Sequence, residues 1–111
     1  MAATPVSPAL KRVATRFAAR LPSRFDQLEG CAKALSVESY ASEMDALHVS
    51  LHEFAGIAPL LGYKELGDRA RDAETLILEL KARSAPPTRE DLAALRSMAM
   101  ALRNTVPADG A

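Results

Sequence analysis

The 111-residue sequence has no tryptophan, a single cysteine and no surplus of charge of either sign. One cysteine, Cys31, cannot form an internal disulfide, so nothing in the chain requires an oxidising compartment. The fourteen basic and fourteen acidic side chains cancel, which argues against the broad positive field of a nucleic-acid-binding or membrane-surface protein. Aromatic residues make up only 5% of the chain, fewer than a β-sandwich normally contains.

Long uncharged runs are also missing. The longest, such as Phe54 to Tyr63, have ten residues, whereas a membrane-spanning helix needs about 20. Residues 1–25 contain five basic side chains and no acidic one, as some transit peptides do. Their apolar spacing nevertheless continues unbroken into the following segment. We therefore interpret them as part of the first helix and expect a cytoplasmic protein.

Apolar residues recur at steps of three and four positions, which is the spacing of one face of a helix. Pro22 lies within the first such segment, so we expect its helix to be either kinked or split at this residue. Gly62 follows the second and most regular segment, in the position of a helix stop. The four segments extend from Leu10 to Leu35, from Met44 to Leu61, from Leu66 to Leu80 and from Leu92 to Val106.

Short connections join these segments. Ser84 to Pro87 is a linker, and Thr88 with Asp91 three residues later has the form of a capping box. Because short loops force neighbouring helices to run antiparallel, we predict an all-α fold, an antiparallel up-down four-helix bundle. The bundle is expected to comprise residues 1–106, with a loose tail over residues 107–111.

The two histidines, His48 and His52, are four residues apart in the most regular segment, and neither lies on its apolar face. His52 is about 100° around the helix axis from Leu51, at the edge between core and solvent. Gly56 lies one turn after His52, and a glycine within a helix costs roughly 0.5–1 kcal/mol relative to alanine. We interpret this glycine as a feature that leaves the imidazole open to a large partner.

Around His52 the sequence resembles the signature of histidine phosphotransfer (HPt) domains of bacterial phosphorelays. That pattern has an apolar residue two positions after the histidine, glycine at four and ten, leucine at fourteen and an acid or amide at twenty-two. All positions are filled here, by His52, Phe54, Gly56, Gly62, Leu66 and Glu74. The motif covers about a quarter of the chain, and the chain length and the helical pattern fit the family as well.

The resemblance implies that His52 accepts a phosphoryl group on its outward ring nitrogen. It would take the group from an aspartyl phosphate of one receiver domain and pass it to the aspartate of another. The implied partners are response-regulator receiver domains and a hybrid histidine kinase, without nucleic acid or membrane. The chain would be a phosphoryl carrier with no ATP site, metal or cofactor of its own, with Mg²⁺ on the receiver and a monomeric state favoured.

An imidazole needs a partner on its inner nitrogen to be held in one tautomer. Glu74 flanks the apolar residue Ala73, on the helix expected to run antiparallel to the one that carries His52. We predict that the Glu74 carboxylate orients the imidazole through a hydrogen bond to its inner nitrogen. A pairing of Glu74 with Arg71 is the alternative.

One departure from the family concerns the position three residues after the histidine. Many members have lysine there, and this chain has Ala55. We therefore expect the phosphoryl charge to be stabilised by the partner's metal and lysine, or by Lys64 or Arg71, and the transfer to be slower or more dependent on the partner. The residues expected to contact a partner are His48, Val49, Ala55, Gly56, Pro59, Tyr63, Lys64 and Arg71.

Two other functions remain compatible with the sequence. The absent lysine favours a helical interaction module that binds a receiver or kinase without being phosphorylated. Histidines four residues apart share a helix face, which is also a metal-binding spacing, although no His-Glu-x-x-His motif is present. Gly56, for its part, could be a close-packing glycine between helices.

Overall fold

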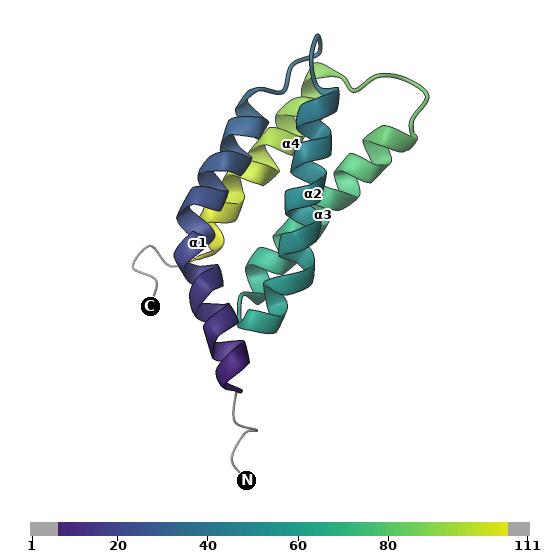
Figure 1. Ribbon diagram of the computed structural model, residues 1–111. Coiled ribbons are helices and arrows are strands. Elements are labelled where there is room, and N and C mark those ends of the chain that lie inside the picture. Colours follow the sequence, from purple (N-terminus) through teal and green to yellow (C-terminus); the bar gives the residue numbers. More distant parts are fainter. Residues whose placement is uncertain (1–6, 107–111) are drawn as a thin grey trace.

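In the computed structural model, which describes residues 7–106, the chain forms four α-helices and two short 3₁₀ turns. Each helix packs against the next and α4 packs against α1, with successive helices antiparallel (Figure 1). The predicted all-α up-down bundle is confirmed, whereas the expected tail, residues 107–111, lies outside the described residues. The elements are α1 (Pro8–Lys33), α2 (Ala41–Ile57), η1 (Pro59–Leu61), α3 (Lys64–Ala82), α4 (Arg89–Ala101) and η2 (Leu102–Thr105).

Each helix has one apolar face, and these faces pack together in a single core. Phe54 of α2 lies at its centre, with the rings of Phe17 and Phe25 of α1 packed against it at centroid distances of 6.2 and 5.8 Å. The middle of α3 contributes small residues to this core, where Ala70 and Ala73 are fully buried. Among the described residues no helix combines the length and the apolar character that a membrane span requires.

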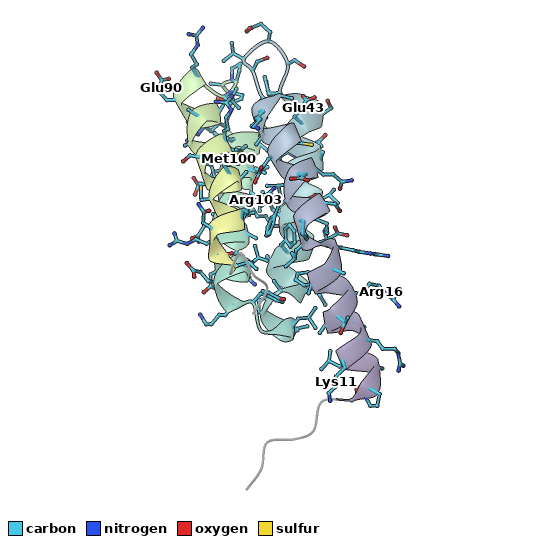
Figure 2. The ribbon with its side chains drawn as sticks, turned by 90° about the vertical axis from the view of Figure 1, so that its left-hand side faces the viewer. Lys11, Arg16, Glu43, Glu90, Met100 and Arg103 are labelled. Carbon is cyan, nitrogen blue, oxygen red and sulfur yellow. The ribbon has the colours of Figure 1, made fainter. Side chains whose placement is uncertain are left out.

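The first turns of α1 differ from the expected pattern. Leu10 and Val13 belong to the predicted apolar face, yet they are 40% and 43% exposed. Figure 2 shows the reason: the end of α1 that carries Lys11 extends beyond the other three helices. No neighbouring helix is long enough to cover it, so helical periodicity alone overestimated the core here.

Pro22 lies within one continuous helix, so the alternative of two separate helices is wrong. Proline lacks the N–H that would donate to the carbonyl four residues earlier, that of Ala18. Ala18 and Pro22 are both exposed, so this carbonyl faces the solvent side of α1. The loss of one hydrogen bond on a solvent-exposed face costs less than the same loss in the core, because water can bind the free carbonyl.

Two helix boundaries follow the predicted signals. The α-helical part of α2 ends at Ile57, and Pro59 begins the 3₁₀ turn that precedes Gly62. Gly62 has φ of 95°, in the left-handed region that favours glycine. At the start of α4 the predicted capping box is present, and the backbone N–H of Thr88 holds the pKa of Asp91 below its usual value.

We expect replacement of Gly67 with alanine to destabilise the bundle. The added Cβ would lie 2.7 Å from Pro59 Cδ and closer still to Cγ, and the rigid ring cannot rotate away. Overpacking of this kind costs about 1–3 kcal/mol, which exceeds the roughly 0.5–1 kcal/mol that alanine gains over glycine within a helix. The free energy of unfolding in urea measures the effect.

Gly30→Ala in α1 is the matched control, because a Cβ at Gly30 would meet nothing within 4 Å. This variant is expected to be more stable than the wild type through helix propensity alone. A Gly67→Ala variant as stable as Gly30→Ala would contradict the close approach of Pro59 to α3.

Candidate functional site

The imidazole of His52 stands on the exposed side of α2, with 75% of its side chain accessible to solvent. Its Nδ1 atom lies 2.6 Å from Oε2 of Glu74, which reaches across from α3. A carboxylate oxygen only accepts hydrogen bonds, so Nδ1 carries the proton and donates it to Glu74. In this neutral tautomer the lone pair is on Nε2, the ring nitrogen not engaged by Glu74. The contact expected between Glu74 and the inner nitrogen of His52 is therefore present.

His48 contacts the same carboxylate oxygen. Its Nε2 atom lies 3.2 Å from Oε2 of Glu74, and its side chain is 30% exposed. The two rings lie edge to face, with centroids 6.2 Å apart. Glu74, only 14% exposed, is thus enclosed by two imidazoles from successive turns of α2.

The register between α2 and α3 brings these groups together. On one side of the histidines Lys81 of α3 donates to Asp45 of α2 at 2.6 Å, which lowers the pKa of Asp45 from its usual value. On the other side Arg71 donates to the backbone carbonyl of Ala55 at 3.5 Å. Arg71 therefore contacts α2, and the alternative pairing of Arg71 with Glu74 is absent. Together these contacts mark an antiparallel pair in which Glu74 lies opposite His52.

Gly56 leaves one side of the His52 ring open. A Cβ built at Gly56 would have no atom within 4 Å, so the reading of this residue as a close-packing glycine is wrong. Helical side chains lean towards the N-terminus of their helix and cover the preceding turn. A side chain at position 56 would therefore lie over the turn that carries His52, and glycine keeps that space free.

Three more of the residues expected to face a partner are exposed. Val49 is 61% exposed on the turn before His52. Lys64 is 83% exposed, and its ammonium group pairs with Asp68 on its own helix at 2.9 Å. Pro59 is exposed as a residue, but its ring also packs against Gly67.

Two of the residues expected to contact a partner are too buried to form an open contact surface. Ala55 is only 5% exposed and belongs to the buried core of the bundle. A partner cannot reach it without displacing the core. Tyr63 is half-buried and its ring packs on Phe17 of α1, with centroids 5.3 Å apart. Tyr63 therefore packs against the core, and only part of it is accessible to a partner.

Two features of the site were not expected from the sequence. Leu60, in the 3₁₀ turn after α2, is 73% exposed, and no rule of periodicity assigns a face to a residue in such a turn. The second is the bond from His48 to Glu74, since His48 was expected only to contact a partner. Its four-residue spacing from His52 was the available signal, because a carboxylate that reaches one residue of a helix face is close to its neighbour one turn away.

The alternative of a metal site finds no support. Among residues 7–106 no group of three or more His, Cys, Asp or Glu side chains is arranged to hold a metal ion. Instead, His48 and His52 both direct a ring N–H at Glu74.

The two histidines are expected to differ in reactivity towards diethyl pyrocarbonate, which acylates an unprotonated ring nitrogen. In His52 the unprotonated nitrogen, Nε2, belongs to a side chain that is 75% exposed. In His48 the unprotonated nitrogen is Nδ1, and this side chain is only 30% exposed. Limited modification near neutral pH should therefore acylate His52 first, as mapped by fragmentation of the peptide that carries both residues. Preferential modification of His48 would contradict the accessible, unprotonated Nε2 assigned to His52.

Comparison with known families gives one match: the model for the Hpt domain matches residues 12–105, which is nearly the whole chain. Neither the curated proteins nor the solved structures contain a significant match. The matched region includes all four helices except the first turn of α1, and with it the imidazoles and the carboxylate described above. The chain therefore belongs to the Hpt domain family, whose members carry phosphoryl groups on histidine in phosphorelays.

Proposed function

We propose that this protein carries a phosphoryl group on Nε2 of His52 between aspartates of receiver domains. The observation that carries the proposal is the 2.6 Å contact between Nδ1 of His52 and Glu74 on a ring that is 75% exposed. The contact leaves the lone pair on the nitrogen that a partner would meet. The resemblance to HPt domains implies the same role for His52, and Glu74 fills the acidic position of the family signature.

The transfer forms one bond and breaks one. The lone pair of Nε2 attacks the phosphorus of an aspartyl phosphate, the N–P bond forms, and the P–O bond to the aspartate breaks with its electron pair left on the carboxylate. The ring, still protonated on Nδ1, becomes positively charged as the N–P bond forms. The carboxylate of Glu74 stabilises that charge, as an acidic partner does for a catalytic imidazolium. The reverse sequence passes the group to a second receiver.

The bundle contributes the nucleophile and its orientation, and we propose that the receiver contributes the rest. Phosphoryl transfer depends on positioning and on neutralisation of charge at the phosphoryl oxygens. No cation of this chain is in contact with His52 among the polar contacts of residues 7–106. The charge therefore falls to Mg²⁺ and the lysine of the receiver, and to Arg71 or Lys64 once a partner is bound.

We further propose Val49, Gly56 and Pro59, exposed on the same helix or just after it, as part of the surface that meets the receiver. A hybrid histidine kinase as the source of phosphoryl groups, a monomeric state and a cytoplasmic location stay predictions from the sequence. The interaction module that binds without being phosphorylated is the competing function, and the labelling experiment below decides between the two.

Incubation with a phosphorylated receiver domain and Mg²⁺ should label the wild type with an acid-labile, base-stable phosphoryl group. His52→Gln should abolish labelling, because the amide nitrogen has no lone pair available for attack. His48→Gln should retain it. Autoradiography after acid or base treatment identifies the bond type, and a panel of receivers avoids dependence on one pair.

A wild type that no receiver labels, or a His52→Gln variant that is labelled as well as the wild type, would contradict the carrier function. Binding of a receiver without any labelling would support the interaction module instead.

A further inference from the structure

We propose that His48 is a positioning residue for the transfer: it donates from Nε2 to Oε2 of Glu74 and so fixes the carboxylate that orients His52. The inference rests on the proposed function of His52 and assigns to His48 a task other than contact with a partner. His48 would act on the reaction only through Glu74.

The geometry requires both histidines to donate. Oε2 of Glu74 lies 2.6 Å from Nδ1 of His52 and 3.2 Å from Nε2 of His48. A carboxylate oxygen has two lone pairs and accepts two hydrogen bonds. His52 must therefore be the Nδ1–H tautomer and His48 the Nε2–H tautomer. The two rings use opposite nitrogens because Glu74 is level with His52 and one helical turn away from His48.

A second donor matters because the glutamate side chain is flexible. Fixing the rotamers of a glutamate costs conformational entropy, and one exposed histidine is a weak anchor for it. Arg71, one turn earlier on α3, is a charged competitor for Glu74. Arg71 donates to the carbonyl of Ala55 at 3.5 Å, a long hydrogen bond that holds the guanidinium only weakly. The bond from His48 holds Glu74 on the side of His52.

The surroundings of His48 suit this task better than a place on a docking surface. Its side chain is 30% exposed, against 75% for His52. The ring lies edge to face with that of His52. Asp45, the acid one turn before His48 on α2, is paired with Lys81, which leaves Glu74 as the acceptor that His48 contacts.

Substitutions of His48 can distinguish the effect of losing its N–H donor from the effect of losing its ring. His48→Phe and His48→Leu remove the donor with two different shapes, whereas His48→Gln keeps an N–H near the position of Nε2. We expect the first two to slow phosphorylation of His52 by about fivefold, the equivalent of one ordinary hydrogen bond. His48→Gln should restore a rate close to that of the wild type. Lys81→Gln is the matched control, since it removes another polar bridge between α2 and α3 without contact with Glu74.

The tautomer of His52, read from ¹⁵N chemical shifts of its ring, is measured on the same variants without any receiver. The Nδ1–H tautomer should lose population in His48→Phe and His48→Leu but not in His48→Gln or Lys81→Gln. Unchanged transfer rates and tautomers in the Phe and Leu variants would overturn the role of His48, as would a Gln variant as impaired as the Phe variant. Failure of the wild type to accept any phosphoryl group would refute the carrier function instead, and the tautomer would still decide whether His48 fixes Glu74.

Discussion

The hydrogen bond between Nδ1 of His52 and Oε2 of Glu74 is the interaction on which the rest of the site depends. It spans two helices, α2 and α3, and is only 2.6 Å long. The bond decides which ring nitrogen carries the proton and therefore which one has the lone pair. Without it, an exposed imidazole would exchange between tautomers and rotate freely.

The packing of the bundle makes this hydrogen bond possible, because it holds α2 and α3 close together in one register. The contact between α2 and α3 is the most extensive between any two helices of the described chain, and both helices bury small residues, Ala55 on α2 and Ala70 and Ala73 on α3. Small side chains allow two helices to approach closely, which brings a glutamate on one within reach of a histidine on the other. A site on rigid helices holds its geometry more accurately than one on loops. Burial of Ala55 is thus a consequence of the packing that positions Glu74.

Much of this arrangement could be predicted from the sequence. The apolar periodicity identified four helices. The resemblance to the HPt signature, together with the place of Glu74 beside Ala73, identified the pair that meets across α2 and α3. Periodicity gives the face of each helix but not the length of its neighbours, so it wrongly placed Leu10 and Val13 in the core. Nor does it give the rotation of α2 against α3, which depends on how the whole core packs. For that reason the burial of Ala55 and the bond from His48 became visible only in three dimensions.

The tautomer of His52 in the wild type and in Glu74→Ala tests the central claim most directly. Long-range ¹H–¹⁵N correlation spectra at neutral pH distinguish a protonated from an unprotonated ring nitrogen. In the wild type Nδ1 of His52 should be protonated and Nε2 should not, and this preference should be lost when Glu74 is replaced. Protonation of Nε2 in the wild type, or the same spectrum in both proteins, would contradict the account.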